Sequence, residues 1–217
     1  MADERTWLAT ARLEALTDGI FAFAMTLLVL SIMMPEDPTD SGYMPNATLR
    51  EMLLHEWRMF LNYAIAFLLL ASFWMNHSRE FRMIKSTEHS HTWINIIFLM
   101  FVVLVPFTTD LIGDYGEDRI SWFLFGANMF ILGSLLYLNW WYASRNRMLI
   151  HADVKQEHIE VGKRRGLLVP AISLLSIGIA FFDTNLAGFT YLLIPVIMML
   201  PYFHVKDYRR QALTKKK

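Results

Sequence analysis

The polar side chains of this sequence that could do chemistry lie at the ends of long apolar runs. A charged group deep in an apolar helix is costly, so it usually has a polar partner. At the rise of an α-helix, Asp18 lies about 9 Å further along the first run than Arg12. If the first three runs form antiparallel helices, their polar groups meet at one level. We expect a structural polar network of Arg12, Thr17, Asp18, Trp74, His77 and Asn95.

The partners within this network should come from different helices. Arg12 and Asp18 are six positions apart, about 240° around a helix, so they cannot face each other on the same one. For Arg12, which lies nearest the end of the run, an alternative is that the side chain simply extends to water.

The first run also contains an apolar stripe with helical spacing. Six side chains fall on one narrow side of the helix: Leu16, Ile20, Phe23, Leu27, Leu30 and Met34. Thr26 flanks this stripe, and Asp18 points nearly opposite Phe23. A stripe of this kind usually packs against other helices or lipid, and lining a pore is the alternative.

The sequence carries no signature of an enzyme, a metal site or a nucleic-acid-binding module. It has no Gly-rich phosphate loop, no His-Glu-x-x-His motif, no nucleophile elbow and no cysteine. The spacings of His77, His89 and His91 fit no standard set of metal ligands. The filter sequence Thr-Val-Gly-Tyr-Gly is also missing. We therefore expect no catalytic residue, no metal and no cofactor.

Membrane-spanning helices are the elements that would position these residues. A bilayer core of about 30 Å needs roughly 20 apolar residues per helix, and 55% of the 217 residues are hydrophobic. An open sheet would leave backbone groups unpaired in lipid, which favours helices. The sequence predicts an all-α integral membrane protein with one six-helix domain, 1–217, that ends in a basic tail, 205–217. The six apolar runs are 20–34 (extended back to 15), 59–76, 92–109, 120–144, 166–182 and 186–204.

The basic residues predict how these helices are oriented. With six spans and a cytoplasmic N-terminus, 17 of the 20 Lys and Arg residues fall on the cytoplasmic side. Both termini are then cytoplasmic, and the protein is a multi-pass protein of the cell membrane. Ten acidic and three basic residues fall outside, a formal charge of −7. This charge reflects either loop solubility or an outer mouth that attracts cations.

The segment 12–30 resembles a known family. Its opening residues, Arg12-Leu-Glu-Ala-Leu16-Thr17-Asp18-Gly19, closely resemble the signature Arg-x-x-x-Phe-Ser-Asp-Gly of the transmembrane protein 175 potassium-channel family, in its prokaryotic single-repeat branch. The resemblance extends to Ser72-Phe73-Trp74, His77, Asn95 and Pro106-Phe107-Thr108. The last three spans match only in topology.

The resemblance implies a potassium-preferring cation channel that conducts passively. Members of the prokaryotic branch are homotetramers in which four first spans line a central pore, and large apolar side chains form its narrowest part. Carried over by position, this constriction falls on Phe23, Leu27 and Leu30, and Thr26 matches a threonine that faces or borders the pore. The implied partners are further copies of the chain, the lipid bilayer and monovalent cations.

This sequence departs from the family pattern at three positions, and rival functions remain open. Leu16 replaces the signature Phe, Thr17 replaces Ser, and Phe23 stands where Ile is expected. A secondary transporter of a small cation or solute is the first alternative, because prolines interrupt the last two runs. A membrane scaffold or small intramembrane enzyme is the second.

Overall fold

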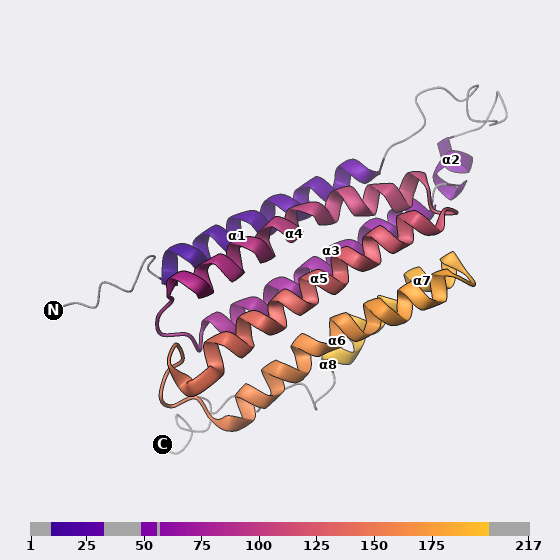
Figure 1. Cartoon of the computed structure of the whole chain (residues 1–217). Coiled ribbons are helices and arrows are strands. Elements are labelled where there is room, and N and C mark those ends of the chain that lie inside the picture. Colours follow the sequence, from indigo (N-terminus) through magenta and orange to yellow (C-terminus); the bar gives the residue numbers. More distant parts are fainter. Residues whose placement is uncertain (1–9, 33–48, 56, 200–217) are drawn as a thin grey trace, which may run out of the picture.

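The protein is an elongated bundle of long helices that lie side by side (Figure 1). The computed structural model describes residues 10–32, 49–55 and 57–199. Within these ranges the only β-type pairing is an isolated bridge between Ile84 and Ile150. The helices are α1 (Thr10–Leu27), η1 (Leu28–Ser31), α2 (Leu49–His55), α3 (Trp57–Phe81), α4 (His89–Asp114), α5 (Arg119–Ser144), η2 (Arg145–Arg147), α6 (Gln156–Ala180), α7 (Thr184–Thr190) and α8 (Leu193–Met199).

Four described segments are long and apolar enough to cross a membrane: Thr10–Ser31, Trp57–Phe81, His89–Asp114 and Arg119–Arg147. They correspond to the first four predicted spans. The predicted fifth span, 166–182, lies in α6 except for its last two residues. The helix begins ten residues earlier than expected and so includes the basic run 163–165. These charges lower its average hydropathy, although the part from Gly166 onward is apolar.

The expectation of one continuous helix over 186–204 is wrong for its described part. The chain forms two short helices, α7 and α8, which are interrupted at Tyr191 and Leu192. Pro195 is the third residue of α8, within the first turn, where its missing amide hydrogen costs nothing. Tyr191 turns inward and packs edge-on against Phe125 of α5, with ring centroids 5.1 Å apart. The remainder of the predicted span, 200–204, lies outside the described residues.

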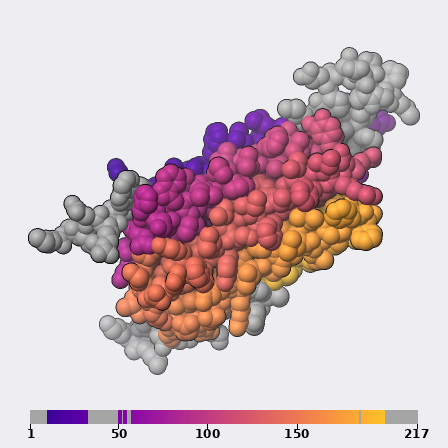
Figure 2. Space-filling view, in the orientation of Figure 1, coloured from indigo at the N-terminus to yellow at the C-terminus, as the bar shows by residue number. Residues whose placement is uncertain are grey.

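The helices pack in the order α1, α4, α5, α6, and α3 lies against both α1 and α4. Figure 2 shows α1 along one long edge of the molecule and the α6–α8 segment along the opposite edge. The main apolar core runs through all of these layers and includes Phe21, Phe73, Phe98, Met129 and Ile172. Because α1 is an edge element, only one of its sides is covered.

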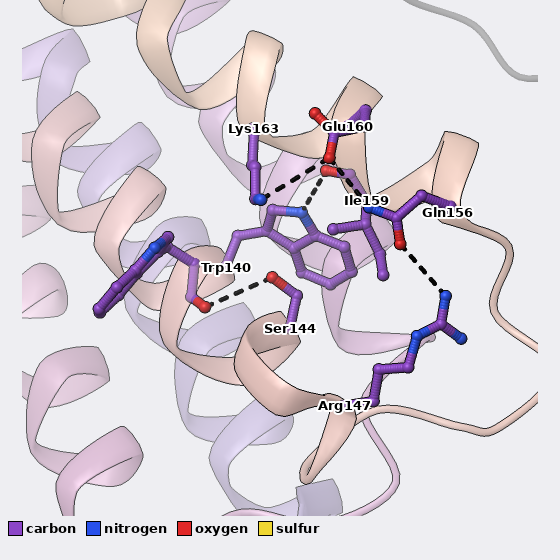
Figure 3. A network of polar contacts seen from close by, with 8 residues as sticks. Trp140, Ser144, Arg147, Gln156, Ile159, Glu160 and Lys163 are labelled. Atoms are coloured by element: carbon purple, nitrogen blue, oxygen red, sulfur yellow. Dashed lines mark hydrogen bonds and ion pairs between the residues drawn. The ribbon is translucent and has the colours of Figure 1, made fainter.

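The α5–α6 interface depends on glycines. An added Cβ at Gly162 would lie 2.3 Å from the indole nitrogen of Trp140, and one at Gly133 would lie 2.5 Å from Cδ of Pro170. Small residues of this kind let membrane helices approach closely. Trp140 Nε1 uses the close approach to donate a 3.0 Å hydrogen bond to the Ile159 carbonyl oxygen (Figure 3).

The connections at this end of the bundle are joined to each other. Met83 accepts a backbone hydrogen bond from His151, and Lys85 donates one to Leu149, on either side of the Ile84–Ile150 bridge. The α5–α6 connection is further held by Arg147, whose guanidinium donates to the Gln156 side chain (3.3 Å; Figure 3) and to the Val154 carbonyl oxygen (3.0 Å).

Candidate functional site

One side of α1 and η1 is uncovered by the rest of the chain. Leu13, Thr17, Phe21, Ala24 and Leu28 face the interior. On the other side, 59% of Phe23 and 62% of Leu30 are exposed. The exposed side as a whole consists of Ala11, Arg12, Ala15, Leu16, Asp18, Gly19, Ala22, Phe23, Thr26, Val29 and Leu30.

The composition of this side is unusual for a surface that faces lipid. The centre line of this side consists of small residues: Ala15, Gly19, Ala22 and Thr26. The charged Arg12 and Asp18 lie toward the end of α1 that is predicted to be cytoplasmic. Lipid tails favour large apolar side chains, whereas small residues favour close approach of another helix. Charged groups in a span usually face protein or water. The exposed side of α1 therefore suits a protein interface or an aqueous path.

The predicted apolar stripe is only partly confirmed as one surface. Leu16, Phe23 and Leu30 are exposed, but Ile20 and Leu27 are half-buried at its edge. The change from α-helix to 3₁₀-helix at Leu28 alters the geometry, because residues three apart in a 3₁₀-helix lie directly above one another. Met34 lies outside the described residues.

Thr26 is exposed beside the stripe. Its hydroxyl donates a 2.7 Å hydrogen bond to the carbonyl oxygen of Phe23, one turn earlier. A hydroxyl that donates in this way still has oxygen lone pairs that can accept. Thr26 therefore presents an oxygen, rather than a hydrogen, to whatever lies against this side of α1.

Among the described residues, four of the six predicted members of the polar network are joined, in two separate pairs. The exposed group is a single hydrogen bond from Trp74 Nε1 to Asp18 Oδ1, 2.7 Å long, which joins α3 to α1. Thr17 is buried and donates to the Leu13 carbonyl oxygen within its own helix (2.9 Å). Arg12 is exposed at the first turn of α1 and is not brought into either group in the described part of the chain.

The buried group contains a residue that the sequence analysis missed. The His77 ring nitrogen Nε2 lies 2.9 Å from Asn95 Oδ1. Asn139 of α5 donates to the same oxygen (2.7 Å), and Asn95 Nδ2 donates both to Asn139 Oδ1 (3.1 Å) and to the His91 carbonyl oxygen (2.9 Å). The two amides thus pair reciprocally and link α3, α4 and α5.

A second buried polar pair begins next to His77, and its acid, Glu80, was missed by the sequence analysis. Asn76 Nδ2 donates to Glu80 Oε1 over 3.3 Å on the same face of α3, and both residues are buried. Glu80 could have been noticed in the sequence, because it is an acid within a helical turn of His77. The predicted run 59–76 ended just short of it.

Comparison with known proteins confirms the resemblance seen in the first span. A family model described as "Endosomal/lysosomal potassium channel TMEM175" matches residues 12–106. A potassium channel of Streptomyces collinus is 28% identical over 181 residues, which cover 82% of this chain and 85% of that protein. A potassium channel of Chamaesiphon minutus is 26% identical, over 82% of this chain and 87% of that protein.

The fold is similar to that of a solved member of the family. The crystal structure of a lysosomal potassium-selective channel TMEM175 homologue from Chamaesiphon minutus superposes with a TM-score of 0.75. The match has 25% sequence identity and covers 89% of this chain and 97% of that one. The similarity therefore extends well beyond the segment 12–106 that the family model matches.

Proposed function

We propose that this relative of the transmembrane protein 175 channels is itself a potassium-preferring cation channel, in which the exposed sides of four α1 helices surround a central pore. The uncovered side of α1, with its small and polar residues, is the observation that carries the proposal. Four subunits placed around an axis would bury this side and give its Arg12, Asp18 and Thr26 a protein or water environment. The homotetramer is thus part of the proposal.

The pore has an apolar neck instead of a ring of carbonyl oxygens. Phe23, Leu27 and Leu30 from four subunits would form stacked rings around the axis. Narrow apolar necks lose water readily, so an ion that crosses one pays part of its dehydration energy there. Thr26 is the nearest polar group, and its free lone pairs can replace some of the lost hydration.

The polar groups beside the neck hold the helices in place. The Asp18–Trp74 bond ties α1 to α3, and the His77–Asn95–Asn139 group ties α3 to α4 and α5. In this arrangement Asp18 lies at the edge of the exposed side of α1, where Trp74 holds it, and the His77–Asn95–Asn139 group is buried behind α1. Their role is structural, and ions contact the rings and Thr26.

Flux through purified protein in liposomes tests the function. A channel dissipates a K⁺ gradient without a coupled ion, and the reversal potential with K⁺ and Na⁺ on opposite sides gives the preference. Saturating flux that requires a second ion would contradict the channel and favour the transporter alternative. Absence of flux from well-assembled protein would contradict both.

The membrane orientation is tested separately. We propose six spans with both termini in the cytoplasm, supported by the distribution of basic residues. A cysteine at Asp114 should react with an impermeant thiol reagent added to intact cells, whereas one at Gln156 should react only after the cells are opened. The chain has no native cysteine, so no background labelling arises. The opposite pattern would reverse the orientation.

A further inference from the structure

A cavity of about 800 Å³ lies at the end of the bundle where α3 and α5 begin. Its walls come from the first turns of α3, the end of α4, the α4–α5 connection, the start of α5, and α7. This volume is within the range of sites that hold small organic molecules, and it is far larger than a single metal ion needs. Neither the pore nor the polar groups described above use it.

The α4–α5 connection that forms one wall is held firmly. Trp122 Nε1 donates to the Gly116 carbonyl oxygen (2.8 Å), and the Ser121 hydroxyl donates to that of Tyr115 (2.7 Å). Asp118 caps α5 by accepting from the Ile120 amide (2.9 Å). Gly188 of α7 makes room for the Trp122 ring, since an added Cβ would lie 2.6 Å from it. The cavity is therefore preformed on this side, which limits the entropy lost when a ligand binds.

The walls combine aromatic faces with an excess of negative charge. Trp57, Tyr115, Trp122 and Phe189 line the cavity, and the indole nitrogen of Trp122 is already occupied, so that ring offers only its apolar surface. With Asp118 engaged in the helix cap, the carboxylates of Asp114 and Glu117 outnumber the one guanidinium in the cavity lining, that of Arg58. Aromatic faces and carboxylates together attract cations that also have apolar surface.

We infer that this cavity binds an alkylated ammonium group, whose charge lies near Asp114 and Glu117 and whose alkyl groups contact Trp57 and Trp122. An inorganic cation would keep its water and gain little from the aromatic walls. The same ammonium chemistry occurs in free organic cations and in the choline headgroup of a phospholipid. Arg58, at the same cavity, could pair with a headgroup phosphate.

Isothermal titration of tetrapropylammonium chloride into the purified full-length protein, in a maltoside detergent and sodium buffer, tests this inference. We expect saturable binding of one ligand per chain. Cation–π and carboxylate contacts of this type predict that Glu117→Gln and Trp57→Ala each weaken binding by about threefold or more. Glu157→Gln and Trp93→Ala are matched controls at other places in the bundle. Trp57 and Trp93 have the same exposure, 52%.

The outcomes are separable from those of the channel proposal, because binding is measured without an ion gradient. No saturable binding, or equal affinity in wild type, Glu117→Gln and Trp57→Ala, would overturn the inference. Circular dichroism and elution volume must first show that the variants are folded. We expect them to fold, because Trp57 and Glu117 are exposed. Competition by glycerophosphocholine identifies a lipid headgroup as the source of the ammonium group. Failure to compete, with tetrapropylammonium still bound, identifies a free organic cation.

Discussion

Trp74 of α3 donates a hydrogen bond to the carboxylate of Asp18 on α1, with 2.7 Å between the indole nitrogen and Oδ1. Asp18 belongs to the exposed side of α1, so this bond fixes the helix that we propose to line the pore against the helix behind it. The first prediction follows from this pair.

Removal of the bond should loosen the assembly without changing its ion preference. Trp74→Phe removes the donor, whereas Asp18→Asn keeps an acceptor oxygen but removes the charge that strengthens the bond. Each should lower thermal stability and tetramer yield, and the double variant should cost less than the sum, because both changes act on one interaction. Thermal unfolding followed by size-exclusion chromatography measures this. A well-assembled Asp18→Asn tetramer with altered K⁺ over Na⁺ preference would contradict a structural role.

The second prediction concerns the width of the neck. Leu27→Ala or Phe23→Ala should widen and wet it, and so raise single-channel conductance and weaken the preference for K⁺. Leu175→Ala on α6 and Phe123→Ala on α5 are matched controls, because both remove an exposed apolar side chain from another helix. Equal currents in Leu27→Ala and Leu175→Ala would mean that α1 does not line the pore.

The third prediction isolates the hydroxyl of Thr26. Thr26→Val keeps the shape of the side chain but removes the oxygen that faces outward from α1. Selectivity should fall while assembly is unchanged, since the lost hydrogen bond is local to the helix. Thr26→Ser should retain selectivity. Reversal potentials for the three proteins decide the matter, and a selective Thr26→Val channel would exclude Thr26 as an ion ligand.

The fourth prediction concerns the reciprocal amide pair. Asn95→Leu leaves Asn139 and His77 with unpaired buried groups, which typically costs about 1–3 kcal/mol for each group. Asn139→Leu should be similarly harmful. The double variant should be more stable than the sum of the two predicts, because neither amide is then left without the other and only His77 still lacks its partner. Strict additivity in unfolding measurements would show that the two amides do not interact.

The fifth prediction uses two glycines of α6. Gly162→Ala should destabilise the protein by about 1–3 kcal/mol, since its methyl group would overlap the Trp140 indole. Gly178→Ala has open space around its Cβ and should be neutral or stabilising by about 0.5–1 kcal/mol, because alanine favours the helix. If both variants unfold alike, the close α5–α6 contact is not what requires Gly162.

The sequence predicted those parts of the fold and site that depend on local pattern. Apolar runs located the first four long helices. The prediction that Arg12, Asp18, Trp74, His77 and Asn95 meet in one layer remains a prediction, because the structure joins only Asp18 with Trp74 and His77 with Asn95. The division of these residues into two groups could not be predicted, because helix rotation is set by packing. Leu27 illustrates this: periodicity placed it on the stripe, yet contacts with neighbouring helices half-bury it.

Other features were missed because they depend on long-range contacts. Asn139 lies next to Trp140 in an aromatic cluster, and only the packing of α5 against α4 shows that its amide meets Asn95. Pro195 is a local signal for the break between α7 and α8. The inward turn of Tyr191 at this break depends instead on a distant contact, because its ring packs on α5. Neither contact leaves a periodic signal in the sequence.

The bridge between Ile84 and Ile150 has a consequence for how the chain is made. The α3–α4 connection acquires its pairing partner only after α4 and α5 have been synthesised, because that partner lies beyond α5. A nascent chain that stops within α5 therefore has an incompletely paired first connection. The bridge therefore forms only after the first four long helices have been made. It joins the two connections at the end of the subunit that we propose to be cytoplasmic.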